Sequence, residues 1–166
     1  ISGGSSTLAE LDGSFLIPHS GSAPVNLDST LVGEWVVVFN EGGANLTVST
    51  LATPPGPVTI TLNPTPDALV QAQVNAFHYT TVTHDFYRDR AGAGNPGIDI
   101  PITCNTNILD TCNAFFSPGA QSINFFQEGG GCVNTAYASV VSHEYGHFIV
   151  NRLGLGQGAF GEGFGD

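Results

Sequence analysis

The chain carries very little positive charge. It has no lysine and no methionine, and three arginines face 14 acidic residues among 166, for a net charge of −11. A surface this acidic excludes binding to nucleic acid, which needs a basic face, and attraction to anionic membranes. No apolar run approaches the roughly 20 residues that cross a bilayer. We therefore expect neither a nucleic-acid-binding protein nor a membrane protein.

The sequence starts at Ile1 without a signal-peptide pattern, as a mature, processed chain would. Its low charge density and many Ser, Thr, Asn and Gly residues are common in secreted, sheet-rich proteins. We expect an extracellular protein whose length suffices for one domain with a sizeable core. Asn45-Leu46-Thr47 has the form of an N-glycosylation acceptor. A three-residue pattern also arises by chance, and a bacterial source would leave it unused.

Three cysteines leave at least one unpaired within the chain. Cys112 and Cys132 flank residues 113–127, which are predicted to form a hairpin. A bridge between them would close a loop of about 20 residues and stabilise the fold by roughly 3 kcal/mol. Cys104–Cys112, across a shorter loop, is the competing pair. The hairpin geometry favours Cys112–Cys132.

The first 66 residues are predicted to be a β-rich segment of the same domain as the rest. Short β-branched runs separated by Gly, Pro and Asn predict strands there. A helix is expected over residues 67–89, where apolar and small residues recur at helical spacing. A Gly/Pro-rich loop follows at 91–101, and another strand is expected near 98–103. The runs in the first segment are residues 14–17, 33–39, 45–51 and 58–62.

The most informative motif is His143-Glu144-Tyr145-Gly146-His147, which has the form H-E-x-x-H. Two histidines four residues apart lie on one helix face and can share one Zn²⁺. Glu144 lies beside them, where it can take a proton from water activated by the metal. The motif therefore predicts metal-assisted hydrolysis of a peptide bond.

The context of this motif is helical. Residues 134–153 have helical periodicity, and the Gly-rich run 129–131 precedes them. Asn134 or Thr135 is a suitable N-cap.

A third ligand is expected because catalytic zinc usually has three protein ligands and one open position. Glu162 is the nearest carboxylate downstream of the two histidines. Asp166 follows it by four residues and can accept a hydrogen bond from the far ring nitrogen of a ligating histidine. The alternative is that both are solvated acids.

His143-Glu144-x-x-His147 followed by Gly161-Glu162-Gly163-x-x-Asp166 resembles the gluzincin metallopeptidases, in particular the thermolysin and fungalysin groups. Residues 113–116 (NAFF) resemble the N-A-F-W edge strand of thermolysin. Residues 76–87 resemble the helix that packs behind the sheet in both groups. The resemblance covers roughly residues 68–166.

This resemblance implies an α+β fold, the thermolysin-like N-terminal lobe, with a curved, mainly antiparallel sheet, a backing helix and the zinc helix. It implies a zinc-dependent endopeptidase whose partners are peptide or protein substrates. Gluzincins often carry calcium as well, but no loop here has the dense oxygen ligands that Ca²⁺ needs, so calcium is unsupported. The implied roles are zinc ligation by His143, His147 and Glu162, general-base catalysis by Glu144, orientation of His143 by Asp166, and binding of the substrate main chain by Asn113 and Ala114.

The chain departs from these families in two respects. The interval from His147 to Glu162 is shorter, and the helical C-terminal lobe that follows in the family is absent from these 166 residues. A C-terminal fragment or a homo-oligomer would complete such a fold. One hypothesis is therefore a secreted zinc endopeptidase or its N-terminal catalytic fragment. The other is a catalytically inactive, metal-stabilised structural or self-assembling module built on a peptidase fold.

Overall fold

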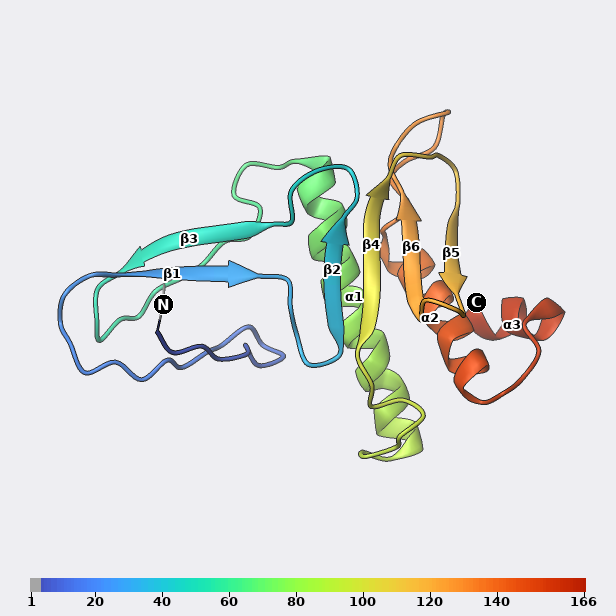
Figure 1. The fold of residues 1–166 in the computed structure, drawn as a ribbon, viewed down its shortest axis with the longest axis horizontal. Helices are drawn as coiled ribbons and strands as arrows, with labels where there is room; N and C mark the ends of the chain where they lie inside the picture. Colours follow the sequence, from blue (N-terminus) through green and yellow to red (C-terminus); the bar gives the residue numbers. More distant parts are fainter. Residues whose placement is uncertain (1–3) are drawn as a thin grey trace.

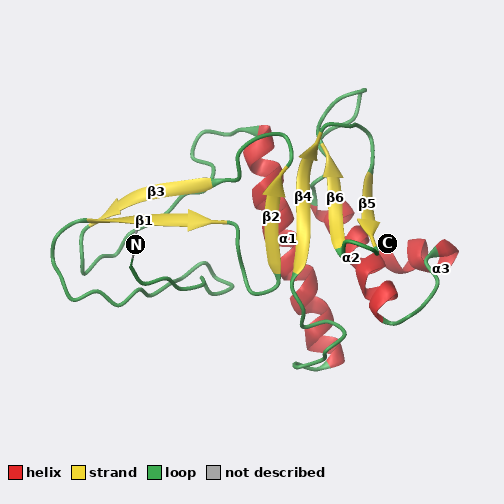
Figure 2. Ribbon diagram, in the orientation of Figure 1, coloured by secondary structure: helices red, strands yellow, loops and turns green. Residues whose placement is uncertain are grey.

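The computed structural model describes residues 4–166, and the elements of this part of the chain are shown in Figures 1 and 2. Its helices are α1 (Ala68–Ala91), α2 (Ala138–Arg152) and α3 (Gly158–Gly165). Its strands are β1 (Val25–Thr30), β2 (Val36–Asn40), β3 (Thr47–Ala52), β4 (Ile102–Ile108), β5 (Ala114–Ser117) and β6 (Ser122–Phe126).

The central layer is a four-stranded sheet in the order β2-β4-β6-β5. β2 comes from the first 66 residues and pairs with β4, so this early segment contributes to the same sheet as the later strands. β1 and β3 form a separate antiparallel pair, to the left in Figure 1. The predicted α+β class is confirmed.

The pairing within the four-stranded sheet differs from the mainly antiparallel sheet that we expected. β4 is parallel to both β2 and β6, and β5 alone runs antiparallel, against β6. The connection from β2 to β4 contains β3 and the long helix α1, and a crossover of this length can return the chain in the same direction. The expectation was wrong because strand direction depends on this connection rather than on strand composition.

Helix α1 forms close to where the sequence predicts it. Asp67 is its N-cap, and its side chain accepts a hydrogen bond from the Val70 backbone N–H at 2.9 Å. Ala72, Ala76 and Thr80 are buried against the sheet. Gly92, with φ of 88°, ends the helix in a backbone conformation that favours glycine.

The predicted strands at residues 14–17 and 58–62 do not form, whereas β1 was not predicted. β1 alternates one intermediate or buried residue with one exposed residue, and it carries Asn26 and Asp28 on its exposed face. β1 and β3 form an antiparallel pair along six residue pairs, so each strand supplies backbone hydrogen-bond partners to the other. A strand needs such a hydrogen-bonded neighbour, which β-branched composition alone does not provide.

Helix α2 begins later than expected, with Tyr137 rather than Asn134 or Thr135 as its N-cap. The Thr135 hydroxyl accepts the Phe126 N–H at 2.8 Å and donates to the Asn113 carbonyl at 2.9 Å. The Asn134 amide donates to Asn107 Oδ1 at 2.7 Å. Asn134 Oδ1 accepts the Ala136 N–H at 3.0 Å, ahead of the helix, so neither side chain caps α2.

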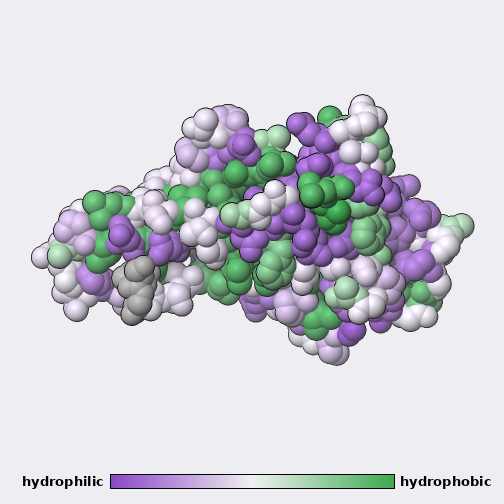
Figure 3. Space-filling model, turned by 45° about the horizontal axis from the view of Figure 1, so that its top comes forward, coloured by the Kyte–Doolittle hydropathy of each residue, from purple (hydrophilic) through white to green (hydrophobic). Residues whose placement is uncertain are grey.

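Helices α1 and α2 pack on the same face of the four-stranded sheet, α1 against β2 and β4 and α2 against β5 and β6 (Figure 1). The core between these layers includes Val36, Ile102, Phe125, Val141 and Phe148, all at 2% exposure or less. On the surface, hydrophobic residues occur in separate groups among hydrophilic ones (Figure 3). No helix within residues 4–166 is long and apolar enough to cross a membrane.

Candidate metal centre

Glycines at the contact between α2 and α3 bring the two helices unusually close together. A Cβ added to Gly146 would lie 2.7 Å from the Gly165 Cα. A Cβ at Gly165 would lie 2.9 Å from both Nδ1 and the backbone oxygen of His143, and one at Gly161 would lie 3.1 Å from His147 Nδ1. Each approach is closer than real Cβ atoms normally tolerate. The glycines explain how so short a connection can place α3 directly on α2.

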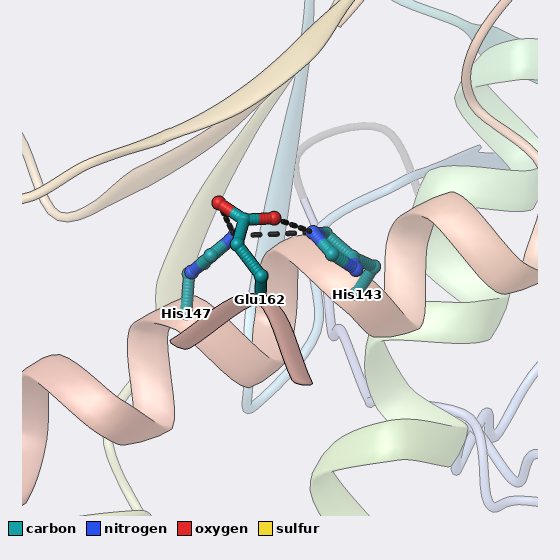
Figure 4. Close-up of side chains that lie close together, drawn as sticks. All are labelled: His143, His147 and Glu162. Carbon is teal, nitrogen blue, oxygen red and sulfur yellow. Dashed lines mark hydrogen bonds and ion pairs between the residues drawn. The ribbon is translucent and has the colours of Figure 1, made fainter. Parts of the chain in front are cut away.

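This contact places Glu162 of α3 over the two histidines of α2, as Figure 4 shows. His143 Nε2 and His147 Nε2 are 3.1 Å apart. The Glu162 carboxylate lies 3.3 Å from His143 Nε2 through one oxygen and 3.7 Å from His147 Nε2 through the other. Among residues 4–166, these three form the one group of His, Cys, Asp and Glu that could hold a metal ion.

The far nitrogen of each histidine ring is held by an acceptor. His143 Nδ1 lies 2.9 Å from Asp166 Oδ1, as predicted for a residue that orients this ring. His147 Nδ1 lies 2.8 Å from Gln157 Oε1, while Gln157 Nε2 donates to the His147 backbone oxygen at 3.0 Å. With acceptors at both Nδ1 atoms, the proton of each neutral ring belongs on Nδ1. Each Nε2 then presents a lone pair toward Glu162 and the other ring.

The spacing of the three donors fits zinc. Tetrahedral ligands at about 2.0–2.1 Å from Zn²⁺ lie about 3.3 Å from one another. The two Nε2 atoms are 3.1 Å apart, and different oxygens of Glu162 lie 3.3 and 3.7 Å from them; one donor atom from each residue lies within 4.8 Å of the other two. Two Nε2 lone pairs and a carboxylate at such distances repel each other unless a cation or a proton lies between them. A set of two imidazoles and one carboxylate is also a known combination for catalytic zinc.

Glu144 lies beside this triad, with its carboxyl near the Phe116 backbone of β5. It is 6% exposed, and burial raises the pKa of its carboxyl, which the nearby His147 and His143 partly oppose. The Phe116 backbone amide lies near the same carboxyl and slightly lowers its pKa. The Oε2 atom is buried and has no hydrogen-bond partner within residues 4–166. One side of the carboxyl thus faces β5, and the other is buried without a hydrogen-bond partner among the described residues.

The two residues predicted to bind a substrate main chain lie at the start of the sheet edge. Ala114 is the first residue of β5, which is the last strand in the sheet order and pairs with β6 alone. Asn113 immediately precedes it, and its carbonyl is already engaged by Phe126 N–H and the Thr135 hydroxyl. Its side-chain amide makes no hydrogen bond to the described residues.

The predicted disulfide between Cys112 and Cys132 is present, so the competing Cys104–Cys112 pair is wrong. The bridge joins the residue before Asn113 to the loop that leads into α2. Cys104 is free and fully buried in β4, with its sulfur 3.3 Å from the Thr80 hydroxyl. Burial raises the pKa of this thiol to about 12.

Two features of the site were not predicted from the sequence. Gln157 lies ten residues from His147 and belongs to no motif, so its hydrogen bonds to that histidine carried no sequence signal. The density of glycine in residues 158–165 was visible, but its use in the contact with α2 depends on how the helices cross.

Comparison with known proteins identifies the fold but not the family. No protein-family model matches the chain, and no curated protein matches it in sequence. Among solved structures, the chain is similar to the precursor of protealysin, a metalloproteinase from Serratia proteamaculans, with a TM-score of 0.56 and 19% sequence identity. The fold is metallopeptidase-like. The match covers 82% of this chain and 42% of that structure, so the chain spans less than half the length of this neighbour.

Proposed function

We propose that this chain is the N-terminal catalytic part of a secreted zinc endopeptidase of the gluzincin type. The observation that carries the proposal is the convergence of His143, His147 and Glu162 at separations of 3.1 to 3.7 Å. The similarity of the fold to a metalloproteinase precursor supports it. The disulfide between Cys112 and Cys132 supports an oxidising, extracellular setting.

Each side chain then has a defined task. His143, His147 and Glu162 would hold Zn²⁺, which supplies Lewis acidity that polarises the scissile carbonyl and eases the deprotonation of water. Asp166 and Gln157 keep the two rings in the tautomer that leaves Nε2 free. Glu144 accepts the proton and returns it to the leaving amine. Its raised pKa brings the carboxyl closer to the pH at which it must both take and give a proton.

The substrate class follows from β5. An extended peptide can add to the open edge of this strand through main-chain hydrogen bonds, with Asn113 and Ala114 at its start. The Glu144 carboxyl lies near the Phe116 backbone of the same strand, so a peptide on this edge would pass the general base. The Glu162 side chain is 67% exposed, which leaves the centre open on one side. A C-terminal segment or a second copy of the chain would supply the opposite wall.

Glu144→Gln tests this proposal because it removes the base while keeping the shape of the side chain. We expect the variant and the unaltered chain to bind one zinc ion each, measured by native mass spectrometry. Peptide hydrolysis should fall by about 10²–10⁴-fold in the variant, the usual contribution of general acid–base catalysis. Hydrolysis that survives the substitution at full rate would refute the assigned mechanism.

The same experiment distinguishes the peptidase from the alternative, a metal-stabilised structural module. A chain that binds zinc and unfolds when the metal is removed, but hydrolyses no peptide in a diverse peptide mixture, would be a metal-stabilised structural module. Glu162→Ala serves as the reference for loss of the metal, since it removes one of three ligands without touching Glu144.

A further inference from the structure

The loop between β2 and β3, residues 41–46, presents Asn45 to solvent. The Asn45 Oδ1 atom accepts the Asn40 backbone N–H at 2.8 Å, which turns this oxygen back toward the loop. The amide nitrogen Nδ2 makes no hydrogen bond within the described residues. Thr47, two positions on, is the exposed first residue of β3, and its hydroxyl also lacks a hydrogen bond within residues 4–166.

The loop holds this arrangement without help from Nδ2. Asn40 Nδ2 donates to the Ala44 carbonyl at 2.8 Å, and Gly42 N–H donates to Asn40 Oδ1 at 3.2 Å. The Leu46 N–H donates to Gln73 Oε1 of α1 at 2.8 Å. These hydrogen bonds hold the loop on both sides of Asn45. The exposed Nδ2 atom of Asn45 is not needed to keep the loop in place.

We propose that Asn45 is an N-glycosylation site, modified on Nδ2 by an oligosaccharide from a lipid-pyrophosphate donor. The bond that forms joins Nδ2 to the anomeric carbon of the first sugar. The bond that breaks joins this carbon to the pyrophosphate oxygen, so the lipid pyrophosphate leaves and the amide proton passes to a base of the transferase. No oxidation or reduction occurs. The modified amide keeps Oδ1, so the hydrogen bond from Asn40 is retained.

Asn63-Pro64-Thr65 provides an internal contrast. It resembles an acceptor site, but proline at the middle position disqualifies it. The Asn63 amide is also occupied, since Nδ2 donates to the Asp67 carbonyl and to Gln71 Oε1, both at 3.3 Å. Asn45-Leu46-Thr47 is the one stretch of the 166 residues that meets the full Asn-x-Ser/Thr pattern.

The position of the loop keeps a glycan away from the proposed chemistry. β2 is at one edge of the four-stranded sheet and β5 is at the other, with β4 and β6 between them (Figure 1). A sugar chain on the β2–β3 loop would leave the β5 edge and the contact between α2 and α3 uncovered. The glycosylation proposal is therefore independent of the peptidase proposal. It requires only that the chain passes through a secretory pathway.

The test is secretion of the chain from a eukaryotic host, followed by intact-mass measurement before and after treatment with a peptide-N-glycosidase. We expect a single glycan on the unaltered chain and its complete loss in Thr47→Val, which keeps the β-branched shape but removes the hydroxyl. Thr47→Ser keeps the acceptor pattern and should keep the glycan. Pro64→Ala creates a second acceptor pattern and reports whether the host machinery also modifies the occupied Asn63 amide.

Secreted protein with an unmodified Asn45 would overturn the proposal, whether or not Pro64→Ala acquires a glycan at Asn63. A glycan that persists in Thr47→Val would also overturn it, because the sugar would then lie elsewhere. Zinc content, measured on the same samples, should be equal in all four proteins. A change in zinc content with no change in glycan would concern the metal site and not this inference.

Discussion

The two histidines of the candidate centre are oriented by side chains of different character. Asp166 holds His143 through one contact, and its side chain is 80% exposed. Gln157 makes two hydrogen bonds to His147, one to the ring and one to the backbone. Since an amide fixed at both ends loses less freedom when the ring binds a metal, Gln157 is the stiffer support.

Replacing Gln157 with leucine should weaken zinc binding by about 10–100-fold, the usual cost of removing a group that orients a metal-binding histidine. Competition with a chromophoric chelator measures the affinity. Gln127→Leu is a suitable control, since the Gln127 side chain makes no hydrogen bond within residues 4–166. Equal zinc affinity in both variants would show that His147 needs no such support.

The ligand set could be predicted from the sequence because it depends on local spacing. His143 and His147 lie one helical turn apart, and Glu162 in α3 and Asp166 at the C-cap of α3 repeat the same spacing. The structure brings these side chains together, and their roles as ligands remain a prediction. Gln157 could not be predicted, because its distance from His147 depends on the course of the connection between the two helices.

The buried Cys104 thiol makes stability depend on alkaline pH. Burial raises its pKa from 9.0 to about 12, so the unfolded chain releases this proton at lower pH than the folded chain. Between these values the folded state binds more protons, and the free energy of unfolding therefore falls as pH rises. Tyr87 and Tyr145 have raised pKa values and act in the same direction.

Chemical denaturation at several alkaline pH values measures this effect. The free energy of unfolding should fall less steeply with pH in Cys104→Ala than in the unaltered chain, because the tyrosine contributions are common to both. The comparison uses the slope of the unfolding free energy against pH, because the substitution also removes packing contacts and so lowers stability at every pH. Identical slopes would mean that the thiol is accessible to water in the folded state.

The contact between α2 and α3 depends on the absence of side chains. A methyl group at Gly146 would meet the Gly165 backbone at 2.7 Å, so one helix must move away from the other. We expect Gly146→Ala to destabilise the fold by about 1–3 kcal/mol, as overpacking does, and to weaken zinc binding as Glu162 moves off the histidines.

Gly163→Ala is the matched control for this prediction. Gly163 lies in the same short helix as Gly165, and a Cβ there would meet no atom within 4 Å. Alanine should stabilise α3 by up to about 1 kcal/mol through helix propensity. Thermal unfolding and chelator competition on both variants measure the outcome. Equal effects of the two substitutions would show that the close crossing is unimportant.

Helix α3 should depend on the metal for its order. It has eight residues, four of them glycine, and no side-chain cap. A helix this short and this rich in glycine is marginal by itself, so packing on α2 and ligation through Glu162 must hold it. Removal of zinc should speed amide hydrogen exchange in α3 while α1 stays protected. Unchanged protection of α3 would contradict a metal-supported helix.

The elements that the sequence predicts well are those fixed by neighbouring residues. Asp67 caps α1 through a bond to Val70, three residues on. The start of α2 was misplaced because Thr135 binds Phe126 and Asn113, which are distant in sequence. The mixed sheet and strand β1 were missed for the same reason, since strand direction and pairing depend on partners elsewhere in the chain.

The net charge of −11 acts over distances longer than any single contact. All three arginines lie in helices α1 and α2, so the strands and the loops between them carry no cationic side chain to offset their acids. Such a field attracts cationic ligands and can raise association rates by about 10–10³-fold at low ionic strength. If peptides bind along β5, those that carry lysine or arginine should therefore associate faster than neutral peptides of the same length.

Stopped-flow association of fluorescent peptides with zinc-loaded Glu144→Gln would measure this preference without hydrolysis. The advantage of the cationic peptide should shrink strongly as salt rises, because the Debye length falls to about 8 Å at physiological ionic strength. A neutral peptide with the same apolar side chains is the control and should respond little to salt. A cationic peptide whose association rate is independent of salt would show that local contacts at β5, and not the net charge, select the substrate.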